Sequence, residues 1–117
     1  LLDTNSIIYA LNQEFVFPNN RYFVSIITEI ELFSYSKLTL EEEHILKTAL
    51  SYFTTININE NIKKHTIEIR KHNKIKLPDS LIIATALDTN SILVTSDKQL
   101  LNSNLIKTIE IKDLRIK

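Results

Sequence analysis

The chain has 117 residues, of which 44% are hydrophobic and 24% are charged, and its formal net charge is zero; it has the composition of one globular domain and no bulk charge that would draw it to nucleic acid or membranes. It contains no cysteine, which excludes disulfides, thiolate nucleophiles and zinc sites with sulfur ligands, and which fits the reducing environment of the cytoplasm. It also contains no glycine, which excludes recognisable forms of the glycine-rich Walker and Rossmann loops that cradle phosphates.

The first half of the chain is predicted to alternate between strands and helices. Leu1 and Leu2 form the end of a strand, and Thr4 or Asn5 caps the helix that follows. The later elements of this half, in chain order, are a loop over 12–21, a strand over 22–26, a helix over about 27–35, a helix that opens with the T-L-E-E capping box at 39–42, and a strand over 54–58.

The second half continues the alternation. Its elements, in chain order, are an amphipathic helix over 59–74, a helix from 77 through 87 that is apolar almost all round and therefore buried, a strand over 91–95, a short helix over 98–102, and a last strand over 106–111. The first of these helices carries Ile62, Thr66 and Ile69 on one stripe. The alternation predicts an α/β sandwich with a mostly parallel sheet. We expect one domain over residues 1–117 that lacks a few native N-terminal residues, because the sequence opens inside an apolar run and has no methionine.

The hexapeptide LDTNSI occurs twice, at Leu2–Ile7 and at Leu87–Ile92. In the first copy a strand enters and a helix leaves, so Asp3 stands at the carboxyl end of a strand. In the second copy a helix enters and a strand leaves, and Asn90 is predicted to end that helix in the left-handed conformation. We therefore expect the two copies at opposite edges of the sheet, with only Asp3 at the edge where parallel α/β sheets bind ligands.

Four acids are candidates for a site at that edge. Asp3 ends the first strand, and Asp97 follows the fourth predicted strand by two residues. Asp79 opens the otherwise buried helix. Glu31 lies in the helix after the second strand, between apolar neighbours, so we expect it to face partly inward, with Glu29 as its competitor.

Each acid also has a purely structural explanation. Asp79 after Pro78 can be an early-turn acid that the helix dipole favours, Asp97 can be an N-cap, and Glu31 can be a half-exposed helix residue. Taken singly, the structural explanation is favoured for Asp79 and Asp97, and the two explanations are evenly matched for Glu31. Asp3 is harder to explain in this way, because burying a carboxylate without a partner is costly.

Taken together, the four acids favour a metal site. No lysine or arginine accompanies these positions as an evident counter-ion, and two carboxylates about 5 Å apart repel by roughly 3 kcal/mol at an effective dielectric near 20. A cluster of four therefore needs a cation or a proton. Oxygen ligands without histidine or sulfur select Mg²⁺ or Mn²⁺. Such a site suits phosphodiester hydrolysis, because the metal lowers the pKa of a bound water and offsets charge on the phosphate.

Four segments resemble motifs of the PIN-domain family, in particular of the VapC-type toxins of bacterial toxin–antitoxin pairs, and they occur in the family's order. "LLDTNSIIYAL" resembles the opening strand and helix with Asp3, and "VSIITEIELFSY" resembles the S-x-x-T-x-x-E-L segment, whose spacing selects Glu31. "LPDSLIIATAL" resembles the segment of Asp79, and "ILVTSDKQL" resembles the T-x-D segment of Asp97. A glycine that is common after the second segment is absent here, but no acid is missing.

The resemblance implies a PIN-like three-layer α/β/α sandwich with a mostly parallel five-stranded sheet. It implies an Mg²⁺- or Mn²⁺-dependent endoribonuclease, the toxin of a type II toxin–antitoxin system. The residues implied to be catalytic and to bind metal are Asp3, Glu31, Asp79 and Asp97. Asn5 and Thr95 would orient carboxylates or water from behind these ligands. The family also implies an RNA substrate, a homodimer, and a cognate antitoxin that fills the active-site groove.

The segment around residues 63–76 is locally basic. Lys71, Lys74 and Lys76 are candidates for contacts with RNA phosphates, although a solvated helix face is the favoured explanation. His65 and His72 lie seven residues apart on one helix face, but no third ligand is in view, which argues against a zinc site.

Two alternatives to the toxin stay open. A PIN nuclease for RNA maturation would have the same acids and no antitoxin, and a non-catalytic Mg²⁺-binding regulatory domain would use its acids for signalling. A phosphatase with a D-x-D-x-T nucleophile is excluded, because Asn5 stands where the second aspartate would be.

Overall fold

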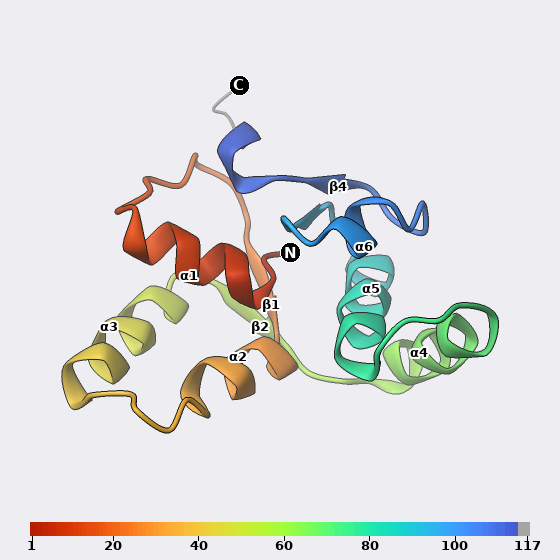
Figure 1. Ribbon diagram of the computed structural model, residues 1–117, viewed down its shortest axis with the longest axis horizontal. Helices are drawn as coiled ribbons and strands as arrows, with labels where there is room; N and C mark the ends of the chain where they lie inside the picture. Colours follow the sequence, from red (N-terminus) through yellow and green to blue (C-terminus); the bar gives the residue numbers. More distant parts are fainter. Residues whose placement is uncertain (115–117) are drawn as a thin grey trace.

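The computed structural model describes residues 1–114 and shows an α/β fold with helices on both sides of short strands (Figure 1). The elements, in chain order, are α1 (Thr4–Asn12), β1 (Phe23–Ser25), α2 (Ile26–Phe33), α3 (Leu40–Leu50), β2 (Thr54–Ile56), α4 (Glu60–His72), α5 (Leu77–Thr89), β3 (Leu93–Val94), α6 (Lys98–Leu101), β4 (Thr108–Ile109) and a 3-10 turn, η1 (Ile111–Asp113). Every helix predicted from the sequence is present, and the strands are shorter than predicted. Among the described residues, no helix combines the length and the apolar character that crossing a membrane requires.

The strands form two parallel pairs that meet at Leu2. β1 pairs with β2, with Val24 opposite Thr55, and β3 pairs with β4, with Val94 opposite Ile109. Leu2 makes parallel bridges to both Val24 and Val94, so the order in space is β2, β1, Leu2, β3, β4. The predicted parallel arrangement is confirmed. In place of a continuous five-stranded sheet there are two short pairs, which the first segment joins through isolated bridges.

Successive residues of the strands contribute to two separate cores, because side chains alternate between the faces of a strand. Leu1 and Leu93 belong to the core beneath α4 and α5. Their neighbours Leu2 and Val94 belong to the core beneath α1 and α3. The helices therefore cover both faces of the strands, with α1 and α3 on one side of Figure 1 and α4 and α5 on the other.

α4 and α5 pack against each other, and a contact between them holds the second LDTNSI copy, which lies at the end of α5. The predicted stripe of α4 is confirmed, since Ile62, Thr66 and Ile69 are all buried. Asn59, the N-cap of α4, donates through Nδ2 to Oδ2 of Asp88 near the end of α5 at 2.9 Å, so the two helices run antiparallel. Asp88 thus lies at the end of α5 that leads into β3, at the amino edge of the strands.

Helix ends show how the chain turns without glycine. Thr39 and Glu42 form the predicted capping box, with both of its reciprocal hydrogen bonds present. Asn90 ends α5 in the left-handed conformation, at φ 51° and ψ 46°, as the sequence predicts. Asparagine tolerates this region better than most residues because its short polar side chain can bond locally, and here it takes the place of the usual glycine.

Candidate active site at the carboxyl ends of the strands

Asp3 is the N-cap of α1, which corrects the prediction that Thr4 or Asn5 caps this helix. Oδ1 of Asp3 accepts a hydrogen bond from the backbone N–H of Ser6 at 2.8 Å. The hydroxyl of Ser6 donates to the carbonyl oxygen of Val94 at 3.0 Å, which fixes the first turn of α1 against the end of β3. The buried carboxylate of Asp3 is therefore held at the carboxyl end of the strands, with a helix N-terminus as its partner.

Asp97 has the same capping role at α6, in agreement with its structural explanation. Its Oδ1 accepts hydrogen bonds from the backbone N–H groups of Gln99 at 2.8 Å and of Leu100 at 3.2 Å. Thr95 is fully buried, and its hydroxyl accepts a hydrogen bond from the backbone N–H of Asp97 at 3.1 Å. Thr95 thereby holds the turn that presents the exposed carboxylate of Asp97.

Glu31 is exposed on α2 and does not face partly inward as expected. Its Oε1 accepts a 2.7 Å hydrogen bond from the hydroxyl of Thr4, the residue after Asp3. The competing acid, Glu29, accepts a hydrogen bond from the hydroxyl of Thr55 on β2 at 3.1 Å. Of the two acids, it is therefore Glu31 that bonds to the residue beside Asp3.

Asp79 shows that the four acids share one electrostatic environment. Burial raises the pKa of its carboxyl above the usual value of 3.8, and the negative charges of Asp97, Glu31 and Asp3 raise it further. Lys76 opposes this shift, which corrects the prediction that no lysine or arginine accompanies the acids. The charges of the other three acids therefore act on the carboxyl of Asp79.

The four carboxylates fit a hard divalent cation by their chemistry. Their donors are oxygens alone, which Mg²⁺ and Mn²⁺ prefer, and a cation would relieve the repulsion that raises the pKa of Asp79. Within residues 1–114, no three His, Cys, Asp or Glu side chains lie close enough to hold a metal ion together. Mg²⁺ usually keeps several of its waters and takes one or two carboxylates from the protein, so two of these acids would suffice as direct ligands. The exposed side chain of Glu31 is not engaged in a helix cap, unlike those of Asp3 and Asp97.

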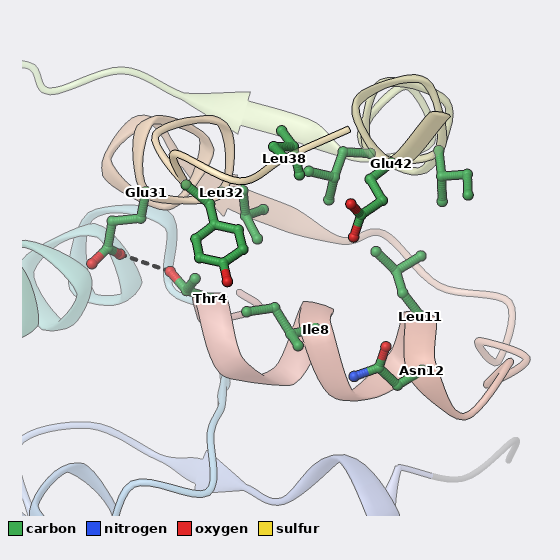
Figure 2. A pocket seen from close by; sticks show the side chains of 11 residues that line it. Thr4, Ile8, Leu11, Asn12, Glu31, Leu32, Leu38 and Glu42 are labelled. Atoms are coloured by element: carbon green, nitrogen blue, oxygen red, sulfur yellow. Dashed lines mark hydrogen bonds between the residues drawn. The ribbon is translucent and has the colours of Figure 1, made fainter. Parts of the chain in front are cut away.

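An apolar groove of about 550 Å³ adjoins these acids, between α1, α2 and α3 (Figure 2). Glu31 and Thr4 lie together at one end of it, and Leu11 and Asn12 lie at the other. Its apolar walls are formed by Ile8, Leu11, Leu32, Tyr35, Leu38, Ile45 and Leu46. Among the described residues, its charged lining residues are Glu31 and Glu42, with no lysine or arginine. The groove escaped sequence reasoning because its walls come from three helices that are separate in the sequence.

The other predicted site residues lie in different settings. Asn5 is exposed on α1. Lys71 is 3.9 Å from Glu68, an exposed pair within α4. Lys74 and Lys76 are exposed in the segment between α4 and α5, and Lys76 is the N-cap residue of α5 without a capping bond from its side chain.

Two further residues near the acids have roles that the sequence analysis missed. Thr4 bonds to Glu31, and its position directly after Asp3 was the available signal that it lies among the acids. Gln99 connects α6 to the segment before α5, because its Nε2 donates to the carbonyl oxygen of Lys74 at 3.0 Å. No local pattern pairs Gln99 with Lys74, since the contact depends on how distant segments pack.

Comparisons with known proteins place the chain among similar folds. Residues 1–103 match the sequence model of the PIN domain. A chain of a toxin–antitoxin complex from Klebsiella pneumoniae superposes with a TM-score of 0.72 at 31% identity, over 94% of this chain and 98% of that one. A chain of VapBC2 from Rickettsia felis, bound to a promoter DNA fragment, superposes with a TM-score of 0.78 at 25% identity, over 93% of this chain and 96% of that one. A chain of VapBC-1 from nontypeable Haemophilus influenzae superposes with a TM-score of 0.72 at 23% identity, over 93% of this chain and 95% of that one. A search of curated proteins found no match.

Proposed function

Because the chain belongs to the PIN-domain family, we propose that it is an Mg²⁺- or Mn²⁺-dependent endoribonuclease that acts as the VapC-type toxin of a type II toxin–antitoxin pair. The observation that most supports the proposal is the 2.7 Å hydrogen bond from the hydroxyl of Thr4, the residue after Asp3, to Glu31. The negative charges of Asp97, Glu31 and Asp3 also raise the pKa of Asp79. The similar chains from Klebsiella pneumoniae and Rickettsia felis belong to toxin–antitoxin complexes, which supports the toxin role.

In this proposal, the acids differ in how firmly the protein holds them. Asp3 and Asp97 present their carboxylates from helix caps, which limits their movement. Asp79 gains most from a cation, because its ionised form is destabilised by burial and by its neighbours. Glu31, whose carboxylate accepts a hydrogen bond from Thr4, would accept a proton from the attacking water. A bound divalent cation supplies a water of lowered pKa and offsets charge on the scissile phosphate.

The proposed antitoxin site is the groove between α1, α2 and α3. Its walls are apolar and both of its charged residues, Glu31 and Glu42, are negative. A segment of the antitoxin with apolar side chains and a basic residue complements this surface in shape and charge. A segment that reaches Glu31 at the end of the groove would also keep RNA away from the acids.

The proposal includes a homodimer. Ile58 and Leu87 are exposed apolar residues, and each directly precedes one partner of the hydrogen bond between Asn59 and Asp88, so both are candidates for the dimer contact. Sedimentation equilibrium tests this part of the proposal: we expect a dimer, and a monomer at every concentration would refute it.

Cleavage of RNA tests the catalytic proposal. We expect the purified protein to cleave total cellular RNA with Mg²⁺ or Mn²⁺, to be inactive with EDTA, and to lose activity on Asp3→Asn. Cleavage by Asp3→Asn at the rate of the parent would show that the site is assigned wrongly. A metal-dependent rise in Tm without cleavage of RNA would favour the regulatory domain.

Growth of an expressing host separates the toxin from an RNA-maturation nuclease. We expect expression to arrest growth, and co-expression of the product of the adjacent gene to restore it. Cleavage without growth arrest, or arrest that no adjacent gene product relieves, would favour the maturation enzyme.

A further inference from the structure

A second hollow, of about 380 Å³, lies between α6 and the segment that joins α4 to α5. Its polar lining includes Lys74, Lys98, Gln99, Asn102 and Ser103, and within residues 1–114 no acidic residue lines it. The groove between α1, α2 and α3 has the opposite character, because it is apolar and carries two glutamates. The two depressions therefore suit chemically different ligands.

Hydrogen bonds within the protein hold the hollow in shape. Nε2 of Gln99 donates to the carbonyl oxygen of Lys74 at 3.0 Å and so joins the two walls. The hydroxyl of Ser103 donates to the carbonyl oxygen of Leu100 at 2.9 Å, which closes the end of α6. The two walls of the hollow are therefore joined by a side-chain contact between elements, and a further bond closes the end of α6.

Lys74 and Lys98 contribute two positive charges to the lining of the hollow. Both are exposed, and within the described part of the chain neither takes part in an ion pair, in contrast to Lys47, Lys63 and Lys71, which each lie within 4.0 Å of a glutamate oxygen. An anion bound here would therefore meet two free ammonium groups. The formal net charge of the chain is zero, so the two lysines mark a local concentration of positive charge and not a property of the whole surface.

The hollow borders the acids. Lys98 directly follows Asp97, so their Cα atoms are about 3.8 Å apart. Lys74 lies two residues before Lys76, whose charge acts on the pKa of Asp79. The hollow is therefore connected to the acids through Lys98 and through the segment from Lys74 to Lys76.

We propose that this hollow binds a backbone phosphate of the single-stranded RNA substrate, next to the phosphate that is cleaved. The inference rests on the proposed function and adds to it the place of the neighbouring phosphate. Lysine ammonium groups act as point charges on phosphate, and phosphate contacts fix the register of a strand without reading its sequence. Lys74 and Lys98 thus position the strand and leave the choice of base to other residues.

The salt dependence of RNA binding tests this inference, because each neutralised phosphate on a single strand contributes about −0.7 to the slope of log affinity against log salt. The probe is a short fluorescein-labelled single-stranded RNA, bound in EDTA so that it is not cleaved and followed by fluorescence anisotropy over a series of KCl concentrations. We expect the double variant Lys74→Gln/Lys98→Gln to bind more weakly and to have a slope that is shallower by roughly 0.7 to 1.4, which corresponds to one or two lost contacts.

The matched control is Lys64→Gln/Lys107→Gln, which removes the same charge from exposed positions. Lys64 lies in α4 and Lys107 precedes β4, and neither is among the described residues that line the hollow. We expect the control to keep the slope of the parent. Equal slopes for the parent and the Lys74→Gln/Lys98→Gln variant would overturn the inference, as would an equal loss in the control.

Cleavage by the parent with Mn²⁺, measured in parallel, separates this inference from the proposed function. If the parent cleaves RNA and the Lys74→Gln/Lys98→Gln variant keeps its slope, the hollow is not a phosphate site and the nuclease assignment stands. If the parent neither binds nor cleaves RNA, both proposals fail. Thermal unfolding followed by circular dichroism verifies that all variants are folded.

Discussion

The hydroxyl of Thr4 donates a 2.7 Å hydrogen bond to Oε1 of Glu31. It also lies 3.3 Å from the hydroxyl of Thr28, which is buried in α2. Thr4 directly follows Asp3, the cap of α1. The bond therefore ties the acid of α2 to the helix end that holds Asp3, and it limits how far the two carboxylates can separate.

Replacement of Thr4 by valine should lower metal-dependent cleavage by roughly tenfold, within the range for residues that orient metal ligands. Valine keeps the size of the side chain, so the cost in stability should be about 1 kcal/mol, the usual value for one hydrogen bond. The measurement is the cleavage rate as a function of Mn²⁺ concentration, together with Tm. We expect Thr4→Val to need more Mn²⁺ for half-maximal activity and Thr4→Ser to behave like the parent. The same Mn²⁺ dependence for Thr4→Val and the parent would show that Thr4 does not position Glu31.

The substitution Asp3→Asn should separate the two roles of Asp3. Asparagine is among the best N-caps, so its amide oxygen can still accept the hydrogen bond from Ser6, and Tm should change little. Cleavage should be abolished, because the carboxylate is lost. The measurements are thermal unfolding and RNA cleavage on the same preparation. A large fall in Tm would mean that the variant reports on folding and not on catalysis.

Asp88→Asn is the matched control, because it makes the same chemical change in the second copy of the same hexapeptide. Asp88 accepts a hydrogen bond from Asn59 at the amino edge of the strands, away from the other acids. We expect Asp88→Asn to cleave RNA at the rate of the parent. Equal losses in Asp3→Asn and Asp88→Asn would contradict the assignment of the acids to one edge.

The raised pKa of Asp79 predicts that Asp79→Asn stabilises the metal-free protein. A carboxyl with a higher pKa in the folded than in the unfolded state lowers stability once pH rises above the folded pKa, and this penalty disappears as pH falls below the usual value of 3.8. In EDTA at neutral pH, Asp79→Asn should therefore have a higher Tm than the parent. The corresponding gain in the free energy of unfolding should be less than about 1 kcal/mol, because solvent screens the half-exposed group. The difference should shrink as the pH is lowered towards 3.8.

Addition of Mn²⁺ should reverse that order at neutral pH. A ligand at 100 times its Kd stabilises the folded state by about 2.7 kcal/mol, and the parent should gain more than Asp79→Asn, which lacks one ligand. Differential scanning calorimetry with EDTA and with Mn²⁺ measures both effects. A lower Tm for Asp79→Asn than for the parent in EDTA would contradict the electrostatic account of this carboxyl.

A change in the groove should separate inhibition from catalysis. Ile45 lines the groove and is 47% exposed, and Ile67 is 46% exposed on α4, outside the groove. Ile45→Lys should leave RNA cleavage intact and weaken inhibition by the product of the adjacent gene by tenfold or more, about 1.4 kcal/mol, because it places a charge in an apolar wall. Ile67→Lys, the control, should leave both unchanged. Cleavage and inhibition assays with both variants measure this, and full inhibition of Ile45→Lys would place the partner elsewhere.

The sequence predicts the features of this fold whose causes are local. The capping box of Thr39 and Glu42 and the left-handed turn at Asn90 depend on neighbours within one turn, and both are as predicted. The extent of the sheet depends on pairing between distant segments. No local sequence pattern marks the bridges from Leu2 to Val24 and Val94. The strands are therefore shorter than predicted, and the expected continuous sheet is replaced by two pairs joined through Leu2.

The candidate site divides in the same way. Asp3, Asp79 and Asp97 could be assigned to one edge because each ends a strand or begins a helix, whereas Glu31 lies within a helix and was selected by the spacing of its segment. The bond from Thr4 to Glu31 and the contact of Gln99 with Lys74 depend on how helices that are distant in the sequence pack. The cap of α1 was misplaced because one residue, Asp3, both ends the first segment and starts the helix.

The double role of Asp3 has a consequence for inheritance of the proposed toxin. An Asp3→Asn allele keeps its helix cap, and with it the folded groove that is proposed to receive the antitoxin. A cell that carried this allele beside an active copy would lose antitoxin to a harmless decoy. Asp3→Asn would then increase the damage done by the active copy, whereas an allele that fails to fold would have no effect on it.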